Sequence, residues 1–132
     1  MINLTKKFSF CAAHRMYNDK FSAEENNKNF GKCQNIHGHN YFIEITISGE
    51  IDEQKGYFVN LNKFSEKIQI NLIQKLDHTY VNEIVPDSLN KPITLEVLST
   101  WIWKILNENL TEYNFIKIRL WETEDNSVEI YK

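Results

Sequence analysis

The segment CQNIHGHN (residues 33–40) runs directly into the alternating stretch YFIEITI (residues 41–47). Alternation of apolar and polar residues predicts a β-strand with one buried face over residues 38–49. In an extended chain, residues two positions apart point to the same side, so His37 and His39 can present both imidazoles to one point. This stretch therefore predicts a strand that begins at a candidate metal site.

The same alternation predicts a first strand over residues 2–12 and two last strands over residues 115–122 and 127–131. We expect Tyr41, Ile43, Ile45 and Ile47 on the buried face of the strand over residues 38–49, with Glu44, Thr46 and Ser48 on the other face.

Two helices are predicted between these strands, over residues 61–76 and 94–109. Asn60 or Asn62 can cap the first helix, and Thr94 can cap the second. Their apolar faces comprise Leu61, Phe64, Ile68, Leu72 and Leu76 in the first, and Leu95, Leu98, Ile102, Ile105 or Leu106, and Leu110 in the second.

The resulting order is β-β-α-α-β-β, which predicts an α+β fold with a four-stranded antiparallel sheet and two helices on one face. Residues 16–36, with a short helix around 22–29, and residues 77–93 are expected to be loops. A loop of about 20 residues inside a compact domain is usually functional. The sheet would have two open edges, which are a liability unless paired, so we expect several copies to close a barrel between subunits.

Length and composition limit the classes of protein. The chain of 132 residues predicts one domain over residues 1–132, and its 42% hydrophobic content excludes disorder as the default. The net charge of −3, without a basic block, argues against a nucleic-acid partner. The sequence has no apolar run long enough for a membrane span and no signal peptide. Two cysteines then indicate a reducing, cytoplasmic protein, with a Cys11–Cys33 disulfide as the alternative.

A third histidine, His14, stands at the end of the first predicted strand. Three neutral imidazoles suit Zn²⁺ and leave a fourth position open, as in catalytic zinc sites. Cys33 lies four residues before His37, where it can be a reactive thiol beside the metal. Two alternatives stay open: the histidines are unrelated, or Cys33 is the fourth ligand of a closed structural site.

Two acidic residues are further candidates. Asp77 precedes His78 where the first helix ends, as in pairs in which a carboxylate orients an imidazole for proton transfer. Such pairs also occur at helix ends for purely structural reasons. Glu122 continues an apolar strand face, so it either reaches solvent or meets a partner, such as the ring edge of a guanine-type or pterin compound.

Five motifs together resemble the 6-pyruvoyltetrahydropterin and 6-carboxytetrahydropterin synthase family over about residues 3–131. They are FSFCAAHR (8–15), FGKC (30–33), CQNIHGHN (33–40), LDH (76–78) and WETEDN (121–126). The resemblance implies the tunnelling fold (T-fold), in which sheets of three subunits close a barrel, two trimers stack into a homohexamer, and active sites lie between subunits.

The resemblance also implies residue roles and a substrate, 7,8-dihydroneopterin triphosphate. It implies His14, His37 and His39 as zinc ligands, Cys33, Asp77 and His78 as catalytic residues, and Glu122, Thr94 and Glu96 as pterin-binding residues.

The motifs combine features of two branches of this family. Three residues separate Cys33 from His37, which resembles the queuosine-pathway enzymes that form 6-carboxy-5,6,7,8-tetrahydropterin and acetaldehyde. The long segment over residues 16–32 and Asn60 instead resemble pyruvoyl-forming enzymes of tetrahydrobiopterin synthesis. We expect the carboxy product, with 6-pyruvoyltetrahydropterin as the alternative. A non-catalytic, zinc-stabilised binding or assembly protein of the same fold is the alternative from another class.

Overall fold

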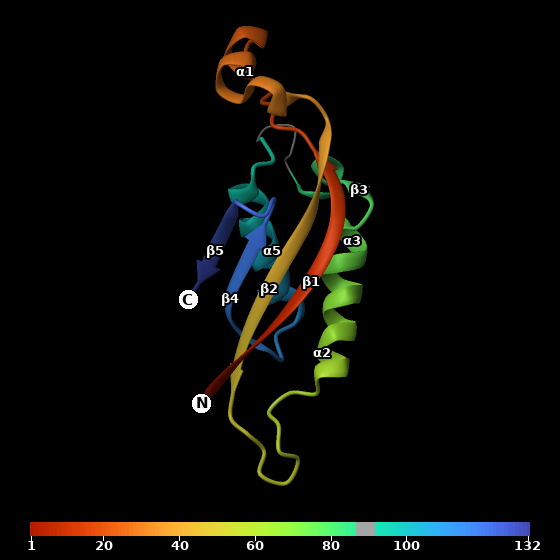
Figure 1. The fold of residues 1–132 in the computed structure, drawn as a ribbon, viewed down its shortest axis with the longest axis vertical. Coiled ribbons are helices and arrows are strands. Elements are labelled where there is room, and N and C mark those ends of the chain that lie inside the picture. Colours follow the sequence, from red (N-terminus) through yellow and green to blue (C-terminus); the bar gives the residue numbers. More distant parts are fainter. Residues whose placement is uncertain (87–91) are drawn as a thin grey trace.

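The computed structural model describes residues 1–86 and 92–132, and it has an α+β fold built on a five-stranded sheet (Figure 1). The strand order is β3-β1-β2-β4-β5. The strands are β1 (Ile2–His14), β2 (His37–Gly49), β3 (Thr79–Tyr80), β4 (Asn114–Trp121) and β5 (Ser127–Tyr131). Neighbouring strands are antiparallel except β1 and β3, which are parallel.

The prediction of a purely antiparallel four-stranded sheet was wrong in one strand. β3 lies in the segment expected to be a loop over residues 77–93, and it pairs with Ala12 and Ala13 of β1. A two-residue strand has no alternation to detect, so only its tertiary pairing defines it. A short helix, α4 (Val81–Ile84), follows it directly. Residues 87–91 of the expected loop lie outside the described residues.

The buried face of the sheet follows the predicted alternation. Tyr41, Ile43, Ile45 and Ile47 of β2 are all buried, and the first strand extends two residues beyond its predicted end, to His14. On the opposite face, Thr46 and Ser48 are also buried, contrary to expectation. The Thr46 hydroxyl lies 2.7 Å from the hydroxyl of Thr5 on β1, so its burial leaves the group hydrogen-bonded.

The helix predicted over residues 61–76 is confirmed as three continuous segments: α2 (Leu61–Ile68), a π-helical turn η2 (Gln69–Ile73) and α3 (Gln74–Leu76). Four of its five buried residues, Phe64, Ile68, Leu72 and Leu76, are spaced four apart, and Ile73 is the fifth. Because an α-helix repeats every 3.6 residues, this spacing would drift around the axis, and the wider π turn keeps it on one side. Asn60 caps the helix, whereas Leu61 is exposed.

The second predicted helix is α5 (Leu95–Asn109), and the Thr94 hydroxyl caps it by accepting a 3.1 Å hydrogen bond from Val97 N–H. It packs against β4 and β5, and Leu106 rather than Ile105 completes its buried face. No helix in the described part of the chain is long and apolar enough to cross a membrane.

The long N-terminal loop contains α1 (Ala23–Phe30) and a 3₁₀ turn, η1 (Gly31–Gln34). Ser22 and Glu25 form a capping box at the start of α1, which explains why this polar segment is helical. The two elements extend beyond one end of the sheet, at the top of Figure 1. They lie at the end where β1 finishes and β2 begins, which is the end that carries the histidines.

Candidate functional site

The antiparallel pairing of β1 and β2 brings three histidines together. His14 lies directly opposite His37, and Ala12 lies opposite His39. One ring nitrogen from each of these histidines lies within 4.8 Å of the others. The predicted cluster therefore forms from two strand ends that are far apart in the sequence.

Backbone carbonyls fix the orientation of two of these rings. His14 Nδ1–H donates to the Ile93 carbonyl and His37 Nδ1–H donates to the Asn35 carbonyl, both at 2.7 Å. A neutral imidazole that donates through Nδ1 has its free lone pair on Nε2. This arrangement of an outer acceptor and an inner lone pair is the usual one for metal-binding histidines.

The third ring completes a set that suits a divalent cation. His39 Nε2 lies 3.1 Å from His14 Nε2. Ligand nitrogens about 2.0–2.1 Å from a tetrahedral Zn²⁺ lie about 3.3 Å apart, so this spacing fits such an ion. Burial lowers the pKa of both His14 and His39, which favours the neutral form that binds metal.

Cys33 lies in η1, exposed to solvent, and its sulfur is not among the cluster's ligand atoms. Its carbonyl accepts a 2.8 Å hydrogen bond from Met16 N–H, which fixes the turn to the first residues after β1. Both cysteines are free thiols, so the alternative of a Cys11–Cys33 disulfide is wrong. Of the two expected metal sites, the open three-imidazole site fits this geometry better than the closed site with Cys33.

Asp77 and His78 lie side by side against β1. Asp77 Oδ2 is 3.0 Å from His78 Nδ1, and Asp77 Oδ1 accepts a 2.9 Å hydrogen bond from Cys11 N–H. The Cys11 amide, and then His78, hold the pKa of Asp77 below its usual value. The His78 side chain is 81% exposed, and within the described chain neither residue is hydrogen-bonded to Cys33.

Of the three predicted pterin-binding residues, Glu122 and Thr94 are linked to the histidine cluster, whereas Glu96 lines a groove along α5. Glu122 Oε1 lies 3.1 Å from His39 Nε2, so this carboxylate adjoins the histidine cluster. Thr94 directly follows Ile93, whose carbonyl holds His14. Glu96 is exposed in a groove along α5, with Trp101 and Lys104, and none of the three histidines lines this groove.

Sequence reasoning missed the groups that orient the rings. The carbonyls of Ile93 and Asn35 carry no sequence signal, because every residue has one. Tyr41 was predicted only as a core residue, yet its ring packs beside those of His14 and His39, with centroids 6.3 and 5.6 Å away.

Comparisons with known proteins agree with this geometry. Residues 3–132 match the family model described as 6-pyruvoyl tetrahydropterin synthase. A protein from Dictyostelium discoideum named 6-pyruvoyl tetrahydrobiopterin synthase is 39% identical, and the match covers 95% of this chain and 92% of that protein. The human protein of the same name is 37% identical, with 98% and 90% covered. The solved Caenorhabditis elegans 6-pyruvoyl tetrahydropterin synthase has a TM-score of 0.88 at 27% identity, covering 99% of this chain and 95% of that chain.

Proposed function

The chain belongs to the 6-pyruvoyl tetrahydropterin synthase family, and we propose that it converts 7,8-dihydroneopterin triphosphate into 6-pyruvoyltetrahydropterin with release of triphosphate. The family is one of lyases, and the cluster of His14, His37 and His39 is the observation that carries the assignment to this chain. The free Cys33 thiol suits the reducing cytoplasm, where we expect the enzyme to act.

This proposal reverses our expectation of a carboxy product. Five curated relatives that are 34–39% identical are named for the pyruvoyl compound, which supports the alternative better. The expectation rested on the three residues between Cys33 and His37. In the structure, the Met16 N–H also fixes the Cys33 turn, so the long preceding segment helps to place the thiol. That segment is the one that resembles the pyruvoyl-forming enzymes.

The metal is proposed to be Zn²⁺, held by His14, His37 and His39 with a fourth position open to substrate. The bound ion would supply positive charge that makes the side-chain hydroxyls of the substrate more acidic. The lone pairs set by the Ile93 and Asn35 carbonyls support this assignment.

The protein side chains would move the protons. We propose that the Cys33 thiolate removes a proton from a side-chain carbon of the substrate, and that His78, oriented by Asp77, returns protons. The pterin ring gains the hydrogen that the side-chain carbons lose, so no external oxidant is needed. Glu122 would accept hydrogen bonds from the pterin ring edge, with Thr94 and Glu96 lining the pocket.

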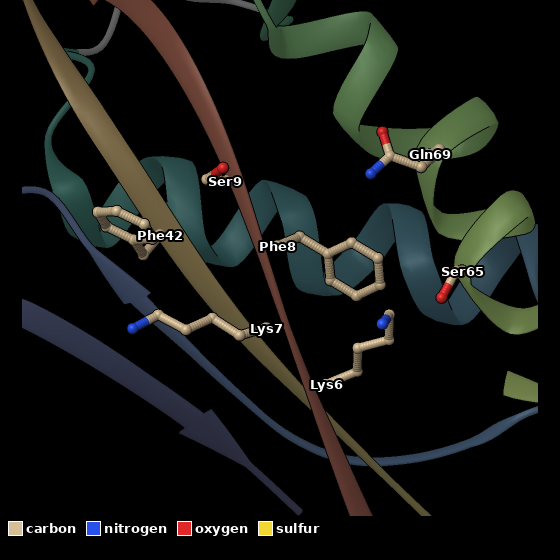
Figure 2. Close-up of a pocket in the computed structure, with 7 residues that line it drawn as sticks. All are labelled: Lys6, Lys7, Phe8, Ser9, Phe42, Ser65 and Gln69. Atoms are coloured by element: carbon tan, nitrogen blue, oxygen red, sulfur yellow. The ribbon is translucent and has the colours of Figure 1, made fainter. Parts of the chain in front are cut away.

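A homohexamer with active sites between subunits is the proposed assembly. β1 pairs with β3 only at Ala12 and Ala13, so most of its outer edge has no neighbouring strand in the described chain. A groove of about 530 Å³ follows this edge, and Figure 2 shows Phe8 on its α2 side and Lys7 beside Phe42 across the strand.

The other edge strand of the sheet, β5, is the natural occupant of this groove. It would lie antiparallel to β1 of the next copy, as barrel closure requires. Such packing would also give the exposed His78 access to a neighbouring subunit's thiol. A monomeric mass in solution would contradict this assembly.

The experiment that tests the proposed function is incubation of Zn²⁺-loaded protein with 7,8-dihydroneopterin triphosphate, with triphosphate release as the signal. We expect release by the loaded protein and none by His37→Ala, which lacks one ligand. Folded, metal-loaded protein that leaves the substrate intact would overturn the proposal. That result would favour the non-catalytic binding or assembly protein of the same fold.

A further inference from the structure

Asn82 in α4 makes a two-point contact with the main chain just beyond β1. Its Oδ1 accepts a 3.0 Å hydrogen bond from Arg15 N–H, and its Nδ2–H donates to the Arg15 carbonyl at 3.1 Å. A carboxamide is suited to this contact because it offers one acceptor and one donor side by side. The contact therefore fixes both the position and the orientation of Arg15 in the main chain.

Arg15, which Asn82 holds through these two hydrogen bonds, lies between two parts of the candidate site. Arg15 directly follows His14, the most buried of the three candidate ligands. The next residue, Met16, donates its N–H to the Cys33 carbonyl at 2.8 Å. The two residues after His14 thus connect a candidate metal ligand to the candidate nucleophile, and Asn82 holds the first of them.

The segment that carries Asn82 also carries the Asp77–His78 pair. Asp77 Oδ1 accepts from Cys11 N–H, and His78 N–H donates to the Cys11 carbonyl at 2.6 Å. β3 then pairs with Ala12 and Ala13, and Asn82 forms its two hydrogen bonds with Arg15. Residues 77–82 are therefore attached to the chain from Cys11 in β1 to Arg15 just beyond it, and Asn82 makes the last of these attachments.

We propose that Asn82 is a positioning residue that places His14 and Cys33 relative to each other through the main chain of residues 15–16. Its contact with Arg15 holds the metal-binding end of β1 in register and anchors the η1 turn through Met16. The role assigned to Cys33 rests on the proposed function, whereas the placement of His14 requires only a metal site. Asn82 touches neither substrate nor metal in this account.

A general loss of stability is the competing explanation for any effect of an Asn82 variant, and a matched control separates the two. Asn107 is also half-buried, and its side-chain amide donates a 2.8 Å hydrogen bond to the Trp103 carbonyl within α5. Asn107→Ala removes one side-chain hydrogen bond to the main chain, in a helix that carries none of the candidate metal ligands. Asn82→Ser is the second variant, since its shorter side chain cannot make both hydrogen bonds to Arg15 and adds no charge near the histidines.

The test measures two quantities without any pterin. The first is Zn²⁺ affinity, by competition with a chelator. The second is the alkylation rate of Cys33 with and without Zn²⁺, in a Cys11→Ala background, because a nearby cation raises thiol reactivity. Folding is checked by circular dichroism, and the midpoint of urea unfolding is compared across the variants.

We expect Asn82→Ala to lower Zn²⁺ affinity about tenfold, the lower end for residues that support metal ligands from outside. It should also weaken the acceleration of Cys33 alkylation by Zn²⁺, while Asn107→Ala changes neither. If either quantity keeps its parental value in folded Asn82→Ala, the proposal is wrong. If that variant does not fold, Asn82→Ser decides by the same criteria. Loss of turnover alone would not bear on this result, since neither measurement uses substrate.

Discussion

His14 Nε2 and His39 Nε2 lie 3.1 Å apart, although 25 positions separate the two residues in the chain. The Ile93 carbonyl accepts a hydrogen bond from His14 Nδ1–H, so the Nε2 lone pair of that ring faces the second imidazole. In the metal-free chain, His39 Nε2–H can donate a hydrogen bond to this lone pair or to Glu122 Oε1, which lies 3.1 Å away. A bound cation would replace that proton and interact with the lone pairs of both rings. The fold therefore brings together a set of donors that a bound cation would stabilise.

Removal of one ligand should abolish tight metal binding. We expect His37→Ala to lower Zn²⁺ affinity by more than about 100-fold, because even outer partners of a ligand cost about 10–100-fold. Metal content after dialysis measures this. His78→Ala is the matched control, since His78 lies outside the cluster and should leave binding unchanged. Equal metal content in both variants would contradict the three-histidine site.

Removal of the Cys33 thiol should abolish turnover without affecting metal binding. We expect Cys33→Ala to keep its Zn²⁺ and lose turnover, because its sulfur is not among the cluster's ligand atoms. Cys11→Ala, which removes the other free thiol, should retain most activity, since Cys11 engages Asp77 and His78 through its main chain. Loss of zinc in Cys33→Ala would show instead that the thiol closes a structural site.

The metal-free protein should lose stability as the pH falls through about 6.5. Burial lowers the pKa of His14 and His39 below the 6.5 of an unfolded chain, so the unfolded state takes up protons first. The contribution of these two histidines to the free energy of unfolding is therefore fully present above pH 6.5. It decreases as the pH falls, until the pH is below the lowered pKa values of both rings. Urea unfolding across this range and NMR titration of the two rings measure the effect. Titration of both rings at or above pH 6.5 would refute it.

The backbone conformation at His78 predicts that glycine at this position is more stabilising than alanine. His78 has φ of 58°, a left-handed conformation that costs a side chain with Cβ about 1–2 kcal/mol. Both His78→Gly and His78→Ala remove the imidazole, and we expect both to be inactive. His78→Gly should nevertheless be more stable than His78→Ala by about 1 kcal/mol in urea unfolding, because glycine adopts this conformation freely. The opposite order would show that the turn relaxes.

Much of this fold could be predicted from local patterns. Alternation located β2 and its buried residues Ile43 and Ile45, and helical spacing located Phe64 and Ile68. These signals suffice because one buried face imposes a fixed period on the sequence. β3 has no such period, since only its pairing with Ala12 and Ala13 makes it a strand.

The candidate site likewise has a part that sequence patterns predict and a part that they do not. Ligand chemistry and spacing predicted the cluster of His14, His37 and His39. The contacts that orient it, from the Ile93 carbonyl and the Asn82 amide, come from segments remote in sequence and have no motif of their own. The distance between Cys33 and its partners also depends on the η1 turn, which residue spacing does not determine.

Mass analysis of the product tests the account most directly. Zn²⁺-loaded protein is incubated with 7,8-dihydroneopterin triphosphate, and the pterin and the volatile products are identified. The account predicts 6-pyruvoyltetrahydropterin with triphosphate and no acetaldehyde. Formation of 6-carboxy-5,6,7,8-tetrahydropterin with acetaldehyde would contradict it.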